Sequence, residues 1–184
     1  MFLHNRETGT TTELSPHEAE ASFSPQFFSL DDKFLYYLTN ENNEFTYLVK
    51  HNIENGEKET VFQKDWDIWY AYESETGKYR VIGVNEDAKT KVYIFDNATG
   101  NEIKLPEIKD GDITSVGISI DEKLIRLTVG TSTSPSNIYV FNIESNNLKR
   151  LTETLNPEIK EGQLVQARVI RYKSYDGLEI PAIY

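Results

Sequence analysis

The chain contains no cysteine, and this absence removes several classes of chemistry at once. Without thiols there is no disulfide, no cysteine nucleophile and no thiolate metal site. A cysteine-free chain is typical of a cytoplasmic protein, and that is the localisation we expect. Basic residues are also few: 19 Lys and Arg stand against 30 Asp and Glu, which gives a net charge of −11 at pH 7. Because nucleic-acid binding needs basic patches that neutralise phosphates, no nucleic-acid partner is expected.

Long hydrophobic runs are missing as well. No stretch of about 18 apolar residues is present, so we expect no membrane-spanning segment and no membrane partner. The first four residues do not lead into the apolar region of a signal peptide. Apolar stripes with a helical period are absent, and residues 15–21 (SPHEAEA) predict at most one or two helical turns. Aromatic residues are frequent, with 11 Tyr and 9 Phe, which favours an all-β fold.

Sequence motifs for catalysis are absent too. The chain has no G-x-S-x-G elbow, no G-x-x-x-x-G-K-[ST] loop, no H-E-x-x-H and no G-x-G-x-x-G. Of its three histidines, His4 and His51 each precede the Asn of a repeated turn, so repetition explains them better than metal binding does, and His17 stands apart. A hydrolytic triad would need a serine, a histidine and a carboxylate converging on one point. We therefore expect no catalytic residue, no metal site and no cofactor in this chain.

A repeat with a spacing of 45 residues is the main feature that is present. Ser29, Ser74 and Ser119 are each followed four positions later by a lysine, and apolar residues flank each of these polar turns. Self-similarity at a period of about 40–50 residues is typical of four-stranded propeller blades. A second signature, a strand that ends in an Asn or Asp turn, recurs out of phase at 52–56, 96–100 and 142–146 and opens the chain at 5–9. Such turns join the two strands of a hairpin.

The two signatures together predict the domain organisation. Residues 1–152 are expected to form a partial β-propeller of about three and a half four-stranded blades, followed by a linker at 153–165 and a hairpin at 166–184. Within the propeller, residues 1–14 are the outer hairpin of a truncated blade, and the blades are 23–62, 67–105 and 112–151. An arc of blades leaves strand edges and apolar flanks uncovered, so we expect a homodimer that forms through these open edges.

Acidic and aromatic residues supply the only binding surface that the sequence predicts. In a blade, the loop between the second and third strands and the loop to the next blade share one face of the propeller. The substrate-facing candidates on that face are Glu41, Glu44, Asp65, Trp66 and Asp67. An aromatic and acidic surface of this kind can receive a cationic or peptide group. The simpler interpretation is a solvated acidic rim, with Trp69 packed between blades.

The last twenty residues break the repeat. They contain the turn Ser174-Tyr175-Asp176-Gly177 and a strand that includes Ile180-Pro181-Ala182. This segment resembles the entry into the hydrolase domain of the prolyl oligopeptidase (S9) family of serine peptidases, in particular its acylaminoacyl-peptidase-like and dipeptidyl-peptidase-like members. The Ser-x-Asp-x-Lys turns at Ser29 and Ser119 also resemble the propeller of this family, and the turn at Ser74 departs from that pattern by having Thr76 in place of the Asp.

The resemblance implies a function for the whole protein. A serine nucleophile in an α/β-hydrolase domain, beyond Tyr184 and absent here, would hydrolyse short or N-acylated peptides, and the propeller would act as lid and size filter. This chain would then be a non-catalytic fragment that meets the peptide substrate through the missing hydrolase domain. The alternative is a TolB-like propeller module that binds a protein partner. The C-terminal hairpin favours the peptidase, because a TolB-like module is expected to follow a secretion signal and to lack such a hairpin.

Overall fold

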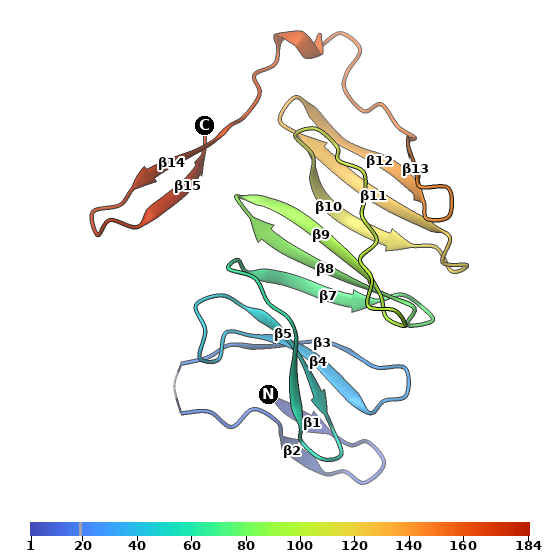
Figure 1. Ribbon diagram of the computed structural model, residues 1–184, viewed down its shortest axis with the longest axis vertical. Coiled ribbons are helices and arrows are strands. Elements are labelled where there is room, and N and C mark those ends of the chain that lie inside the picture. Colours follow the sequence, from blue (N-terminus) through green and yellow to red (C-terminus); the bar gives the residue numbers. More distant parts are fainter. Residues whose placement is uncertain (19) are drawn as a thin grey trace. The chain divides into compact units, whose positions relative to one another are not determined.

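The structure is a computed structural model that describes residues 1–18 and 20–184. Antiparallel strands are its main regular structure, and tight turns and a few longer connections join them (Figure 1). The 3-10 turn Glu161–Gln163 is the only helical element within the described part of the chain. None of the described residues form a helix long and apolar enough to cross a membrane. The chain divides into two compact units, Met1–Val84 and Asn85–Tyr184.

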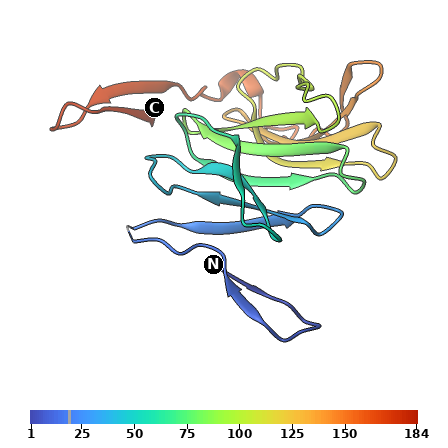
Figure 2. The same ribbon diagram turned by 60° about the horizontal axis from the view of Figure 1, so that its bottom comes forward.

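The first unit contains a hairpin and a four-stranded antiparallel sheet. The hairpin pairs β1 (Phe2–His4) with β2 (Thr11–Glu13). The sheet has the chain order β3 (Phe23–Phe28), β4 (Phe34–Thr39), β5 (Tyr47–Asn52) and β6 (Lys58–Phe62). It is drawn in blue to teal in Figures 1 and 2. Strands β7 (Ile68–Glu73) and β8 (Tyr79–Glu86) come next and, with β9 (Lys89–Asp96), belong to a three-stranded sheet in the order β7-β8-β9.

The central strand β4 shows why this sheet is buried on both sides. Side chains alternate between the two faces of a strand, so Leu35 and Tyr37 share one face and Tyr36 and Leu38 share the other. All four are at most 4% exposed. On the first face, Leu35 and Tyr37 form a core with Leu14, against which Leu3 of the hairpin also packs.

The opposite face of this sheet packs against β7, which contacts β3, β4 and β5. The Tyr36 ring stacks on Phe27, with ring centroids 4.4 Å apart, and lies 4.9 Å from the Arg80 guanidinium. Arg80 in turn forms an ion pair with Glu73 at 3.0 Å. Burial on both faces explains the near-continuous apolar sequence of β4, which does not alternate as a half-exposed strand would.

The second unit contains another four-stranded antiparallel sheet and the C-terminal hairpin. After β9 (Lys89–Asp96), the sheet has the order β10 (Asp112–Ile118), β11 (Leu124–Thr131), β12 (Ser134–Asn142) and β13 (Asn147–Arg150). Its core face carries Ile125, Leu127, Val129 and Phe141, each at most 2% exposed. The hairpin pairs β14 (Val169–Lys173) with β15 (Glu179–Ile183).

The three serines of the 45-residue repeat occupy equivalent turns, so the repeat seen in the sequence is also a structural repeat. The hydroxyl of Ser29 accepts the N–H of Phe34 at 3.0 Å, and the N–H of Ser29 donates to the Phe34 carbonyl at 2.9 Å. Ser74 makes the same pair of bonds with Tyr79, and Ser119 makes it with Leu124. Each serine therefore closes the turn between the first two strands of its sheet.

The Asn and Asp turns also form as predicted. The side-chain oxygen of Asn52 accepts the N–H groups of Glu54 and Asn55, and Gly56 has the left-handed φ of 78° that ends the turn. Asn5 and Asp96 accept the equivalent pairs of N–H groups, and Gly9 and Gly100 have the equivalent φ values. The short polar side chain at the start and the glycine at the end are what this turn requires.

The prediction of four strands at 67–105 is wrong. This segment contains three strands, and the expected fourth is reduced to a single bridge between Phe95 and Glu102 and one hydrogen bond from the Ile103 N–H to the Ile94 carbonyl. Pro106 follows two residues beyond Lys104 and has no N–H, so it cannot continue the ladder. Residues 104–106 leave β9 for this reason.

The predicted helical turns at 15–21 do not form among the described residues of that segment, and Ala19 lies outside them. The Ser15 hydroxyl instead accepts the amino group of Met1, and the Ser15 carbonyl makes a 2.7 Å bond with the Nδ1 of His17. The hydroxyl and the carbonyl of Ser15 are therefore both used in contacts other than those of a helix.

Candidate functional site

A shallow hollow of about 340 Å³ in the first unit contains one of the five predicted candidates, Asp67, beside Trp69. Asp67 and Trp69 line it, together with Leu38 and Thr46. The Trp69 side chain is 59% exposed, so the expectation that it packs between blades is wrong. Trp69 lies at a β-bulge, where the pairing of β7 with β8 shifts between Ile68 and Tyr70, and it is exposed next to the buried Ile68.

The Asp67 carboxylate has a structural task in this hollow. Its Oδ1 accepts the backbone N–H of Thr46 at 3.0 Å and the hydroxyl of Thr46 at 3.2 Å. The same hydroxyl lies 2.8 Å from the Ile68 carbonyl. Asp67 thus ties the start of β5 to the start of β7, and one of its two oxygens is already used.

Glu41 lies in a different hollow of the first unit, of about 280 Å³, beside Glu18, Glu20 and His17. The Glu41 carbonyl accepts the hydroxyl of Tyr47 at 3.0 Å. Three carboxylates near one histidine could suggest a cation, but no group of metal-ligating side chains with suitable geometry occurs among the described residues.

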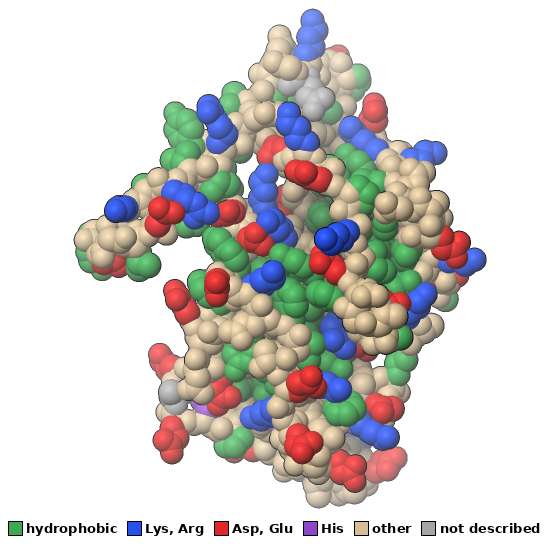
Figure 3. Space-filling view, in the orientation of Figure 1, with side chains coloured by type: hydrophobic (Ala, Val, Ile, Leu, Met, Phe, Trp, Pro, Cys, Tyr) green, Lys and Arg blue, Asp and Glu red, His purple; other side chains and the backbone are tan. Residues whose placement is uncertain are grey.

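The remaining candidates, Glu44, Asp65 and Trp66, line neither hollow. The five predicted residues therefore do not converge on one site. Acidic and basic side chains are also interspersed on the face drawn in Figure 3. Asp67 joins two strands, and the other four candidates lie at the protein surface. Together the five residues form no catalytic arrangement.

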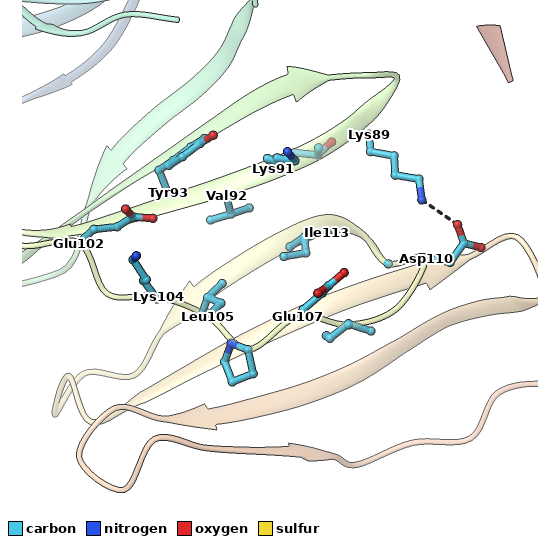
Figure 4. A pocket seen from close by; sticks show the side chains of 14 residues that line it. Lys89, Lys91, Val92, Tyr93, Glu102, Lys104, Leu105, Glu107, Asp110 and Ile113 are labelled. Atoms are coloured by element: carbon cyan, nitrogen blue, oxygen red, sulfur yellow. Dashed lines mark hydrogen bonds and ion pairs between the residues drawn. The ribbon is translucent and has the colours of Figure 1, made fainter. Parts of the chain in front are cut away.

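A larger cavity, of about 450 Å³, lies in the second unit and was not anticipated from the sequence. One wall is β9, and the other is the connection from β9 to β10 (Figure 4). Val92, Leu105 and Ile113 supply apolar surface, and Lys104 extends into the space between the walls.

Two charged clusters border this cavity. At one end the Lys89 ammonium lies 2.7 Å from Asp110, and the hydroxyl of Ser132 also donates to this carboxylate. The hydrogen bonds from Lys89 and Ser132 lower the pKa of Asp110 to about 2. They tie β9 to the turn that precedes β10 and so hold one end of the cavity in place.

At the other end the phenol of Tyr93 donates to Glu86 at 3.1 Å, and Lys91 forms an ion pair with the same carboxylate. Burial, and next the negative charge of Glu86, raise the pKa of Tyr93 to about 12. Tyr93 is thus a neutral hydrogen-bond donor at neutral pH. The only sequence signal for this cavity was Pro106, where the predicted fourth strand cannot continue.

Comparison with known proteins gives matches of fold alone. No protein-family model matches the sequence, and no curated protein matches it. Among solved structures, prolyl oligopeptidase B from Galerina marginata matches with a TM-score of 0.76 and 16% identity, over 98% of this chain and 26% of that chain. Puromycin hydrolase matches with a TM-score of 0.74 and 10% identity, over 95% of this chain and 27% of that chain.

TolB from Acinetobacter baumannii also matches, with a TM-score of 0.59 and 20% identity, over 98% of this chain and 48% of that chain. The chain thus spans about a quarter of the length of these peptidases and about half of TolB. Its small antiparallel sheets have the fold of propeller-like regions of prolyl-oligopeptidase-type peptidases, at a sequence identity that establishes the fold and no more.

Proposed function

We propose that this chain is the propeller portion of a prolyl-oligopeptidase-like serine peptidase. In this proposal it is the lid and substrate filter of an enzyme that hydrolyses short or N-acylated peptides, and the serine nucleophile belongs to a hydrolase domain outside residues 1–184. The observation that carries the proposal is the fold match to prolyl endopeptidases, at a TM-score of 0.72 over 99% of this chain. A match of that extent includes the C-terminal hairpin as well as the sheets.

The C-terminal hairpin supports the proposal by its local structure. Ser174 closes the turn by donating its N–H to the Leu178 carbonyl at 2.8 Å, and Gly177 adopts the left-handed φ of 89°. The Asp176 carboxylate accepts the Leu178 N–H at 3.2 Å. Each residue of the S-x-D-G motif except Tyr175 therefore has a defined role in the turn.

The surface of the hairpin supports it further. Tyr172, Leu178 and Ile183 are 52%, 63% and 60% exposed, and Tyr175 is fully exposed. Exposed apolar patches of this kind mark surfaces that pack against another domain or protein. Such a surface is expected where a propeller leads into a hydrolase domain.

The same proposal covers the setting of the protein. The chain itself supplies no catalytic residue, the peptide substrate is bound chiefly by the hydrolase domain, and the enzyme is cytoplasmic. The alternative proposal, a TolB-like module that binds a protein partner, is favoured by the match to TolB at 20% identity.

Sequencing the gene beyond codon 184 tests the first proposal against the second. A G-x-S-x-G motif within roughly the next 150 residues, the span of one domain, is the expected result. The full-length product should then react with a fluorophosphonate probe, and replacement of the motif serine by alanine should abolish the labelling. A reading frame without such a motif, whose product is not labelled, would refute the peptidase proposal.

A further inference from the structure

The missing fourth strand beside β9 leaves a gap in a hydrogen-bonded edge. In the first unit, β6 pairs with β5 from His51↔Lys58 to Leu48↔Phe62. Asn52 and Asp96 start equivalent turns, and aligning them places Val92 at the position of Leu48 and Pro106 at the position of Phe62. The pair that corresponds to Leu48↔Phe62 would be Val92 with Pro106, and it would require a backbone N–H that Pro106 lacks.

Both ends of this gap are closed by hydrogen bonds. The Thr90 N–H donates to the Asp112 carboxylate at 2.8 Å, and the Ile94 carbonyl accepts the Ile103 N–H at 2.7 Å. Alternate residues of an edge strand direct their backbone groups to the same side, so Val92 directs its N–H and C=O outward between Thr90 and Ile94. No hydrogen bond from Val92 to residues 104–107 occurs among the described residues.

The gap opens into the 450 Å³ cavity. Five consecutive residues of β9, 89–93, line the cavity, which indicates a strand edge, because one face of a strand would contribute only alternate residues. Leu105 and Ile113 lie across from Val92 (Figure 4). A volume of this size is typical of a small-ligand or short-peptide pocket.

The lysines that line the cavity differ in whether they form ion pairs. Lys89 and Lys91 are held in ion pairs with Asp110 and Glu86. Lys104 also lines the cavity, and its ammonium forms no ion pair within the described part of the chain. Glu102 and Glu107 line the cavity as well, so a peptide with one carboxylate placed at Lys104 fits better than a strongly acidic one.

We propose that this edge binds a short extended peptide that completes the sheet. One peptide residue exchanges backbone hydrogen bonds with Val92, its apolar side chain packs against Leu105 and Ile113, and an adjoining carboxylate meets Lys104. Strand addition to an open edge is a recurrent mode of peptide recognition. The occupant resembles the segment of β6 that ends at Phe62, which fills the corresponding place in the first unit. The proposal is independent of the peptidase assignment.

Titration of the ¹⁵N-labelled chain with the peptide acetyl-Thr-Phe-Glu-Val-amide tests the pairing. Saturable shifts should appear at the Val92 amide and its neighbours on β9. N-methylation of the peptide backbone at Phe should weaken binding by about tenfold, the order of one lost hydrogen bond together with a steric clash. The analogue with Gln in place of Glu should bind about threefold to fivefold more weakly, as one exposed ion pair predicts.

Two variants with a matched control separate this site from general attraction to lysines. Lys104→Ala should reproduce the threefold to fivefold loss, whereas Lys109→Ala, at an exposed lysine of the same connection outside the cavity, should bind like the parent. Pro106→Val supplies an N–H that can donate to the Val92 carbonyl and so allows the full pair, in which the carbonyl of residue 106 accepts the Val92 N–H. This variant should therefore protect the Val92 amide from hydrogen exchange and abolish peptide binding. Equal losses in the two lysine variants, or no saturable shift at Val92 up to millimolar peptide, would overturn the proposal.

Discussion

Replacement of the three repeated serines by alanine tests how strongly burial determines the contribution of one hydrogen bond to the free energy of unfolding. Ser29, Ser74 and Ser119 make the same bond to the N–H five residues later, but the bond is buried at Ser74, part-buried at Ser29 and exposed at Ser119. The serine hydroxyl accepts that N–H, and the serine carbonyl accepts a different N–H within the turn. Alanine therefore leaves the N–H without its protein partner.

The expected losses in unfolding free energy follow from solvent access. At Ser74 water cannot replace the hydroxyl, and an unsatisfied buried donor costs about 2 kcal/mol. At Ser119 water can hydrate the Leu124 N–H and can replace the exposed bond from the Ser119 hydroxyl to Asp121, so the net loss is about 0.5 kcal/mol. Ser29, whose hydroxyl donates in the same way to Asp31, should fall between the two at about 1 kcal/mol. Ser145→Ala is the surface control, because only the backbone N–H of Ser145 is hydrogen-bonded in its turn.

Amide hydrogen exchange measured by NMR reports each site separately, which matters because the chain has two units. Exchange of the Tyr79 amide should accelerate by about 30-fold in Ser74→Ala, since about 1.4 kcal/mol corresponds to a factor of ten. The Leu124 amide in Ser119→Ala should accelerate by only a few-fold. Equal acceleration at the three sites, or the largest effect at Ser119, would show that burial does not control these bonds.

Three further predictions concern activity, pH and assembly. The chain alone should not hydrolyse chromogenic esters or aminoacyl anilides, and turnover that a serine-directed phosphonate abolishes would reveal a nucleophile that we have missed. Burial, and next the charge of Lys58, lower the pKa of His51 below its usual 6.5, so the unfolded chain binds this proton at a higher pH than the folded chain does. The free energy of unfolding should therefore decrease as the pH falls below about 6.5. Urea titrations of His51→Leu should show a smaller decrease. The apolar side chains exposed on β14 and β15 should make the chain self-associate, and light scattering that gives one chain's mass over a tenfold rise in concentration would contradict this.

Local features of this protein were predictable from its sequence because neighbouring residues create them. The hydroxyl of Ser29 bonds a group five residues away, and Asn52 bonds groups two and three residues away. The positive φ of Gly56 satisfies the same turn. A pattern of residue types therefore located the turns, and the strands between them followed from their apolar and β-branched content.

Features that depend on distant residues were decided only by the tertiary structure. The candidate acidic residues do not lie together in one site, because the Asp67 carboxylate is hydrogen-bonded to Thr46, a residue 21 positions earlier. Trp69 is exposed at a β-bulge of β7, and this bulge depends on the pairing with β8, which strand periodicity does not predict. The cavity beside β9 needed the departure of residues 104–106 and the ion pair from Lys89 to Asp110 together. The sequence by itself determined the repeated turns, since each is stabilised within one short segment. Pro106 marked where the fourth strand beside β9 ends, but only the tertiary structure decided that the open edge borders a cavity, because residues distant in sequence form its walls.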